Sequence, residues 1–151
     1  MDSYLTWLRA RVGTDPVILT CAVACVLDEG RLLLQKRPDG RWGLPGGFMD
    51  LGESLMETAA RETKEETGID IEIGELLGVY SKYFDEYPSG DRAQVVTAAF
   101  VASPAGGVAQ ADNIESLEVR WVPLGELPPM FNSQHQDVVD DLREGRRNVF
   151  R

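Results

Sequence analysis

The sequence has little from which to build a metal site of sulfur and nitrogen ligands. Its 151 residues include two cysteines, Cys21 and Cys25, and one histidine, His135. On a strand the two thiols would point to one face but lie too far apart along it to bond to each other. No further Cys or His cluster completes a zinc site. We therefore expect buried, reduced thiols in a cytoplasmic protein, and a solvated His135 near the start of the last helix.

Positive charge is also scarce. Fifteen Lys and Arg residues stand against twenty-five Asp and Glu residues, which gives a net charge of −10. Such a field repels the backbone of a nucleic acid, so we expect no nucleic-acid polymer as a partner. It repels the phosphates of a small nucleotide as well. If phosphates are the substrate, a metal ion has to lie between them and the protein.

Long apolar runs are absent too. No segment approaches the roughly 20 apolar residues that a membrane helix needs. The start of the chain, MDSYLTWLRARVG, lacks the basic segment, apolar stretch and cleavage site of a secretory signal. The length suits one domain, and 43% hydrophobic residues can form its core. We expect a single domain over residues 1–151, with no membrane partner and a cytoplasmic location.

Periodicity and turn residues predict the secondary structure. The best-defined helix begins after Ser54, which forms a capping box with Glu57, and ends at Gly68. A core-facing stripe on this helix consists of Leu55, Met56, Ala59, Ala60 and Thr63. Further helices are predicted at 3–12, within an N-terminal extension 1–16, and at 134–144, capped by Ser133 within a C-terminal segment 131–151. Strands are predicted at 17–27, 31–37, 69–84, 92–103 and 116–124. The predicted fold class is α/β, a mixed sheet between helices (α/β/α).

Three carboxylates are clustered on the best-defined helix. Glu62, Glu65 and Glu66 are spaced i, i+3 and i+4, so they project from one patch and repel one another. A hard cation explains the arrangement, because Mg²⁺ binds carboxylate oxygens together with water and substrate phosphate. Arg61 directly precedes the cluster. Its planar guanidinium can donate two parallel hydrogen bonds to one carboxylate. Acidic helix faces also occur without any metal.

The surrounding residues resemble the signature of the Nudix, or MutT-like, hydrolases. The segment GGFMDLGESLMETAARETKEETGI (46–69) fits the pattern G-x5-E-x7-R-E-U-x-E-E-x-G-U, in which U is aliphatic. The matching positions are Gly47, Glu53, Arg61, Glu62, Glu65, Glu66, Gly68 and Ile69. Thr63 stands where an aliphatic residue is usual, and we expect it to alter packing and leave the chemistry unchanged. The resemblance extends over most of residues 17–130 and implies the Nudix fold.

The resemblance also implies an activity and its cofactor. Members of this family cleave a phosphoanhydride bond in a nucleoside diphosphate linked to another moiety, by attack of water at phosphorus. The implied cofactor is Mg²⁺, one to three ions, for which Mn²⁺ can substitute. Implied ligands are the carboxylates of Glu62, Glu65 and Glu66 and the backbone carbonyl of Gly46. Arg61 would orient one of these glutamates.

The resemblance leaves the general base and the substrate open. Candidate bases are Glu66, Glu53 and a carboxylate of the segment DNIESLE, where Glu115 is preferred to Glu118 because it precedes Trp121 by six residues. Candidate substrate contacts are Arg37, Arg41, Tyr83 and Tyr87, whereas Trp42 and Trp121 are expected in the core. Possible substrates are a nucleoside triphosphate, a dinucleoside polyphosphate or a nucleotide sugar. The protein is expected to be a monomer or a homodimer.

Two alternatives share the expected fold. One is a non-catalytic module that binds or senses a nucleotide metabolite; such modules often lose carboxylates of the box, all of which this chain keeps. The other is an isoprenoid diphosphate isomerase, which needs a cysteine near its site. Cys21 and Cys25 lie in an expected buried strand, which speaks against the isomerase.

Overall fold

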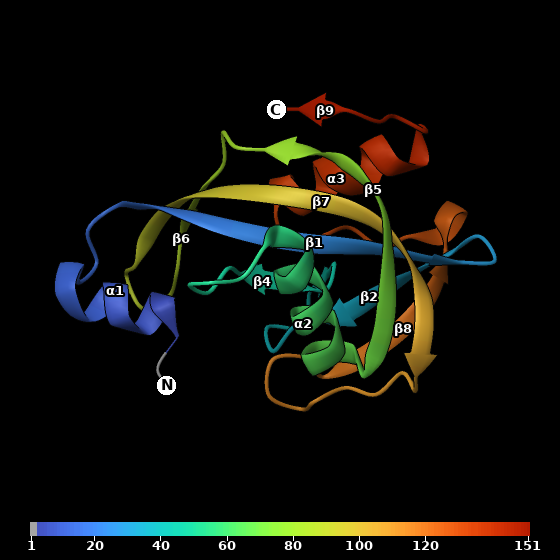
Figure 1. Cartoon of the computed structure of the whole chain (residues 1–151), viewed down its shortest axis with the longest axis horizontal. Coiled ribbons are helices and arrows are strands. Elements are labelled where there is room, and N and C mark those ends of the chain that lie inside the picture. Colours follow the sequence, from blue (N-terminus) through green and yellow to red (C-terminus); the bar gives the residue numbers. More distant parts are fainter. Residues whose placement is uncertain (1–2) are drawn as a thin grey trace.

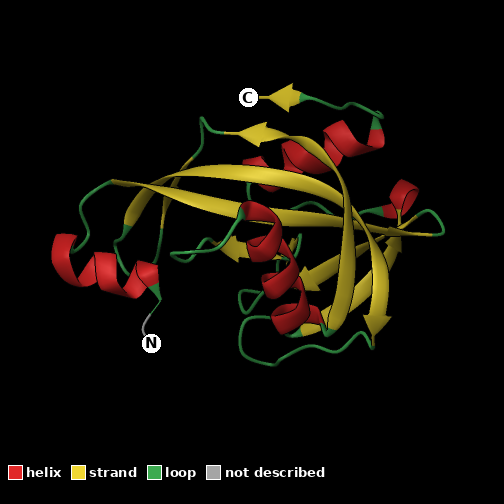
Figure 2. Cartoon of the chain, in the orientation of Figure 1, coloured by secondary structure: helices red, strands yellow, loops and turns green. Residues whose placement is uncertain are grey.

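A nine-stranded mixed sheet forms the centre of residues 3–151, the part of the chain that the computed structural model describes (Figures 1 and 2). Residues 1 and 2, part of the predicted N-terminal extension, lie outside the described residues. The strands are β1 (Val17–Asp28), β2 (Arg31–Lys36), β3 (Trp42–Gly43), β4 (Gly46–Phe48), β5 (Ile69–Tyr80), β6 (Phe84–Glu86), β7 (Arg92–Gly107), β8 (Glu118–Pro123) and β9 (Val149–Phe150). The helices are α1 (Tyr4–Val12), α2 (Leu55–Thr67) and α3 (Ser133–Arg143), with a 3-10 turn at Leu124–Glu126.

The long strand β1 organises the sheet. It pairs in parallel with β7 from Val17 to Val26, and antiparallel with β4 on its other side at Cys21–Val23. Successive side chains of a strand point to opposite faces. The odd-numbered face of β1, which includes Val23, joins a core cluster with Val138 of α3, and Ala22 on the even-numbered face packs with Ala59 of α2. The predicted mixed sheet with helices on both faces is therefore confirmed.

Helix α2 begins and ends where the sequence predicts. Both hydrogen bonds of the capping box between Ser54 and Glu57 are present, and Gly68 ends the helix in the left-handed conformation at φ 77°. Thr63 is fully buried, as expected. The predicted core stripe is wrong at Met56, which is 51% exposed, while Thr58 is fully buried. The buried face of the helix is thus turned slightly from the predicted one.

Helix α3 and two strands differ from the prediction. Asn132, not Ser133, caps α3: it has extended backbone, and its side chain accepts a hydrogen bond from the backbone N–H of His135. The predicted strand 69–84 is interrupted between Tyr80 and Phe84, and β7 continues to Gly107 instead of ending at residue 103. After the interruption, β6 continues along the same neighbour as β5, because both strands pair antiparallel with β7. This pairing brings Asp85 of β6 to the lining of the site described below.

Helix α1 and the burial of the two cysteines agree with the sequence-based prediction. Arg9 of α1 donates to the backbone oxygen of Arg92 at 2.8 Å. Cys21 and Cys25 are buried and free. Among residues 3–151, none of the helices combines the length and the apolar character required to cross a membrane.

A buried carboxylate ties the end of the described chain to α3. Asp141 is 1% exposed, accepts hydrogen bonds from Arg151 at 2.9 and 3.0 Å, and receives the Tyr80 hydroxyl at 2.9 Å. The hydrogen bond from Arg151 lowers the pKa of Asp141 below its ordinary value of 3.8 despite burial. Because the folded-state pKa is the lower one, this carboxylate stabilises the fold above pH 3.8, and the stabilisation is lost as the pH falls through the folded value.

Replacing Asp141 by Asn should therefore destabilise the protein most near neutral pH. We expect a loss of about 1.5–3 kcal/mol in the free energy of unfolding, the usual worth of hydrogen bonds to a charged group. Urea unfolding of both proteins at pH 7 and at pH 3 measures the difference. The difference in the free energy of unfolding between the two proteins should be smaller at the lower pH. A difference that stays constant would contradict the role of the charged carboxylate.

Candidate active site

A cavity of about 520 Å³ opens on the odd-numbered face of β1. Its lining comes from α1, β1, β2, β4, α2, β6, β7 and α3 and from the loops before β8 and α3. The volume falls in the range of small-molecule binding sites. Parts of the chain that are far apart in sequence meet here because β1 lies between β4 and β7.

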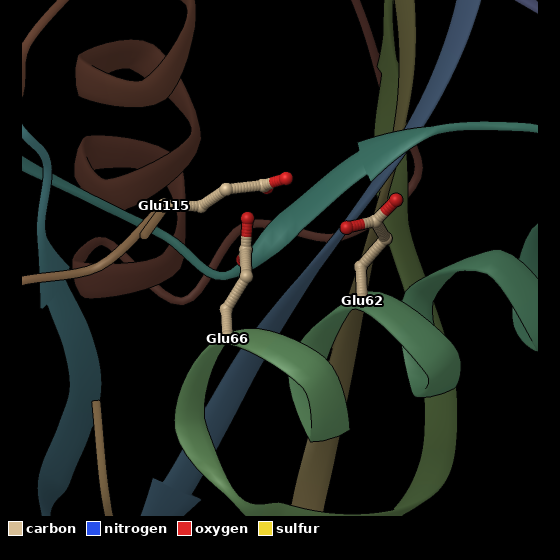
Figure 3. A group of neighbouring side chains, drawn as sticks. All are labelled: Glu62, Glu66 and Glu115. Carbon is tan, nitrogen blue, oxygen red and sulfur yellow. The ribbon is translucent and has the colours of Figure 1, made fainter. Parts of the chain in front are cut away.

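Three carboxylates converge at one end of the cavity. Glu62 and Glu66 project from successive turns of α2, and Glu115 reaches them from the loop before β8 (Figure 3). One carboxylate oxygen of each residue lies within 4.8 Å of those of the other two. The structure thus brings together three of the acidic residues that the sequence singles out.

Glu66 is the most constrained of the three. It is 5% exposed, and its Oε2 accepts hydrogen bonds from the backbone N–H of Gly46 at 3.0 Å and from Nε2 of Gln35 at 2.7 Å. Burial raises the pKa of Glu66 to about 9, and the nearby charges of Glu62 and Glu115 add to the rise. Both hydrogen bonds use one oxygen. The other oxygen remains available to the cavity.

Gly47 makes room for Glu62. A Cβ atom added at Gly47 would lie 2.4 Å from the carboxylate carbon of Glu62 and 2.5 Å from its Oε1. Only glycine at this position lets the glutamate pass so close to β4. Burial raises the pKa of Glu62 above its ordinary value, while the Arg61 guanidinium opposes this rise. The space reserved at Gly47 therefore serves the acidic side chain of Glu62.

The loop that carries Glu115 is held by its own side chains. Asp112 accepts hydrogen bonds from the backbone N–H groups of Ile114, Glu115 and Ser116 at 2.8 to 2.9 Å. Although burial alone would raise the pKa of Asp112, these donors lower it. The Ser116 hydroxyl then donates to the backbone oxygen of Glu66 at 2.5 Å. Sequence reasoning missed Asp112 and Ser116, although an Asp followed by polar turn residues is a recognisable signal.

Arg61 links the remaining residues of the box. It donates to both oxygens of Glu53, at 2.5 and 3.0 Å, and to Glu62 at 2.8 Å. These hydrogen bonds lower the pKa of Glu53 to about 2. Glu53 does not line the cavity. Glu65 does, but its exposed carboxylate pairs with Arg61 at 3.3 Å and lies outside the group formed by the other three.

The candidate substrate contacts divide into two groups. Arg37 and Tyr87 line the cavity. Arg41 lies outside the lining, where it pairs with Asp39 at 2.8 Å and donates to the backbone oxygen of Phe131. Tyr83 lies outside it as well and donates its hydroxyl to Asp137 at 2.6 Å.

The alternative loop carboxylate and the two tryptophans lie elsewhere. Glu118 pairs with Arg120 and does not line the cavity. Trp42 and Trp121, expected in the core, are partly buried against two different core clusters.

His135 corrects an expectation. It is 8% exposed, not solvated, because Val138, Val139 and Leu142 of α3 place this face of the helix on the sheet. Its Nδ1 accepts a hydrogen bond from the backbone N–H of Leu44 at 3.1 Å. Burial lowers the pKa of His135 to about 3, so the ring is neutral at neutral pH and carries its proton on Nε2.

Cys21 is buried as predicted, but it also lines the cavity. Burial raises the pKa of its thiol to about 12, so it remains protonated at neutral pH.

The carboxylate cluster fits a magnesium ion. All three side chains offer oxygen atoms, the ligand type that Mg²⁺ prefers. Ligand atoms on opposite sides of such an ion lie about 4.2 Å apart, so a spread of 4.8 Å requires only small side-chain adjustments. Burial raises the pKa of both Glu62 and Glu66, and of these two only Glu62 has a cationic partner, Arg61 at 2.8 Å. A bound cation would supply further positive charge.

Comparison with known proteins decides the family. The model of the NUDIX domain matches residues 19–142. The chain belongs to this family. A Nudix protein of this kind hydrolyses phosphorus-containing acid anhydrides, so the hydrolase predicted from the box is confirmed and the non-catalytic module is not favoured.

Relatives resemble the chain over most of its length. A Bacillus subtilis (strain 168) protein provisionally named an 8-oxo-dGTP diphosphatase is 36% identical over 132 residues, which cover 85% of this chain and 82% of the relative. An ADP-ribose pyrophosphatase of Methanocaldococcus jannaschii is 31% identical over 148 residues, covering 95% and 79%. The crystal structure of a MutT protein from Bacillus halodurans superposes with a TM-score of 0.72 at 29% identity, covering 87% of this chain and 86% of that one.

Proposed function

We propose that this Nudix hydrolase is a Mg²⁺-dependent pyrophosphohydrolase that cleaves a nucleoside diphosphate linked to another moiety. The observation that carries the proposal is the convergence of Glu62, Glu66 and Glu115 at one end of a cavity with room for a small molecule. In a protein with a net charge of −10, a phosphate chain needs such a cation site to approach at all. Relatives named for nucleotide substrates support the nucleoside part.

Each acidic residue has a distinct proposed role. Glu62, Glu65 and Glu66 hold the metal together with the carbonyl oxygen of Gly46, and the exposed side chain of Glu65 joins them by exchanging its ion pair with Arg61 for the metal. Glu115, the member of the cluster from outside α2, is the proposed general base for the attacking water. Glu53 is a poorer base, since Arg61 occupies both of its oxygens and its pKa is about 2. We assign Glu53 and Arg61 to positioning Glu62.

Bound Mg²⁺ supplies charge neutralisation for the phosphoanhydride and lowers the pKa of the attacking water. The chain contributes orientation. Gln35 and the backbone N–H of Gly46 fix one oxygen of Glu66, and Ser116 fixes the loop of Glu115 to the end of α2. Arg37 and Tyr87 lie on the lining, where a nucleotide can contact them.

A product screen tests the proposal. The protein is incubated with Mg²⁺ and nucleoside triphosphates, nucleotide sugars or dinucleoside polyphosphates, and ³¹P NMR identifies the products. We expect a nucleoside monophosphate and the phosphorylated remainder, from cleavage between two phosphates. Absence of cleavage across all three classes at saturating Mg²⁺ would refute the proposal.

Asp112 gives a separate test of the proposed base. Asp112→Ala removes the acceptor that holds the backbone at Glu115, so kcat should fall by about 10-fold or more while the KM changes little. Steady-state kinetics measures both constants. Asp70→Ala, at an exposed carboxylate paired with Lys64, serves as the matched control and should leave kcat unchanged. Equal effects of the two substitutions would mean that the loop does not position Glu115.

A further inference from the structure

Asp85 is a charged group in the cavity for which the proposed chemistry has no use. Its side chain is half-buried on β6 and lines the cavity. Within residues 3–151 its carboxylate has no hydrogen-bond donor and no ion-pair partner within 4.0 Å. Burial raises its pKa, and the charge of Arg37 opposes that rise. A carboxylate left in this state is a candidate to receive donors from a ligand.

The register of the sheet places Asp85 far from the carboxylate cluster. Asp85 is opposite Ala93, which is opposite Val17 of β1, whereas Gly46 is opposite Val23. Six residues of strand span about 20 Å. Asp85 shares its face of the sheet with Val95, which also lines the cavity. The cavity therefore extends from the proposed phosphate end to Asp85.

Arg37 lines the same cavity and offers hydrogen-bond donors, whereas Asp85 offers acceptors. Its guanidinium carbon lies 3.8 Å from the centre of the Phe131 ring, which holds the planar group in place. Its Nε atom is buried and has no hydrogen-bond partner, and the nearest carboxylate, Asp39, lies 3.9 Å from it. Arg37 and Asp85 are not within ion-pair distance of each other, although both line the cavity. Arg37, whose Nε atom has no hydrogen-bond partner, can only donate, and Asp85 can only accept, so the same cavity offers both kinds of group to a ligand.

A guanine base matches this pair. Its N1–H and 2-amino group are two adjacent donors for a carboxylate, and its O6 and N7 are two adjacent acceptors for a guanidinium. Adenine presents an acceptor at N1 and an amino group at position 6. In the orientation of guanine it would place an acceptor against Asp85 and a donor against Arg37. Hypoxanthine keeps the O6 and N7 acceptors but lacks the 2-amino group. We infer that Asp85 is a specificity-determining residue that, with Arg37, selects a guanine-type base. The inference rests on the proposed function for the identity of the ligand as a nucleotide.

Binding of nucleoside monophosphates tests the inference without any turnover. Isothermal titration calorimetry measures the Kd of GMP, IMP and AMP. Wild-type protein should bind GMP about 10-fold or more tightly than IMP, because one good base contact discriminates by about 1–3 kcal/mol. AMP should bind more weakly than IMP. Equal affinities for the three nucleotides overturn the inference, and this comparison requires no variant.

The variant Asp85→Asn tests whether Asp85 causes the preference for GMP. The asparagine amide replaces one carboxylate acceptor by an N–H donor, which would face the N–H donors of guanine. The affinity for GMP should therefore fall to that for IMP, and the affinity for AMP should increase. Glu86→Gln is the matched control, because Glu86 is the exposed neighbour on β6 and does not line the cavity. A melting curve of each variant verifies folding. A GMP preference that persists in Asp85→Asn would overturn the role of this residue.

The product screen separates this inference from the proposed function. Guanine-selective binding without cleavage of any nucleotide in Mg²⁺ would refute the hydrolytic proposal and leave the base site intact. Cleavage of nucleotides with no base preference, and with no effect of Asp85→Asn, would refute the base site alone.

Discussion

Replacing Glu66 by Gln should lower kcat by about 10²-fold or more while the folded structure persists. A bound metal ion contributes several kcal/mol of charge stabilisation, and each 1.4 kcal/mol corresponds to a factor of ten in rate. The substitution is nearly isosteric. Since the hydrogen bonds from Gly46 and Gln35 both end on Oε2, a glutamine carbonyl oxygen can accept both. The new amide group then takes the place of the oxygen left to the cavity.

The stability of this variant separates catalysis from folding. Burial raises the pKa of Glu66 to about 9, so the charged carboxylate is costly to the folded protein without a cation, and glutamine removes that cost. The melting temperature in EDTA should stay the same or rise. Glu118→Gln, at a carboxylate outside the cavity, is the control and should retain wild-type kcat. If Glu66→Gln retained full activity, the metal assignment would be wrong.

Local sequence signals predict helix α2 almost completely. The ends of α2 follow from the capping box of Ser54 and Glu57 and from Gly68, because these residues satisfy the terminal backbone groups of a helix whatever surrounds it. The spacing of Glu62 and Glu66 likewise determines that both project from one side. The prediction of an acidic site on this helix therefore needs no knowledge of the tertiary structure.

The residues that the sequence analysis missed, such as Asp85, or placed wrongly, such as His135, depend on partners far away in the chain. His135 is buried because Phe131 and Leu44 enclose it, and Leu44 is 91 residues distant. Its spacing from Val138 and Leu142 is typical of one face of a helix. A single polar residue at such a position does not indicate how deeply its side chain is buried. Asp85 lies just beyond the strand predicted at 69–84, and it lines the cavity because β6 pairs with the start of β7. Neither pairing nor register is encoded locally.

Removal of divalent metal should reduce hydrolysis to background, and excess Mg²⁺ should restore it. The same ion should stabilise the fold, because a ligand that binds only the folded state contributes about 2.7 kcal/mol at 100 times its Kd. Thermal unfolding in EDTA and in a Mg²⁺ series measures this effect without substrate. The rise in melting temperature should be large in wild type and in Glu118→Gln. It should be much smaller in Glu66→Gln, which lacks one of the three converging carboxylates.

Hydrolysis and thermal unfolding should report the same affinity for Mg²⁺. If Glu62, Glu65 and Glu66 hold the ion, the Mg²⁺ concentration at half-maximal activity and the Kd from thermal shifts should agree when the substrate concentration is far below its KM. Substrate phosphates add ligands, so saturating substrate should lower the Mg²⁺ requirement. Full hydrolysis in EDTA would defeat the mechanism. An equal Mg²⁺ shift in wild type and Glu66→Gln would place the ion elsewhere, because Glu66 is one of the proposed ligands and one of the three converging carboxylates.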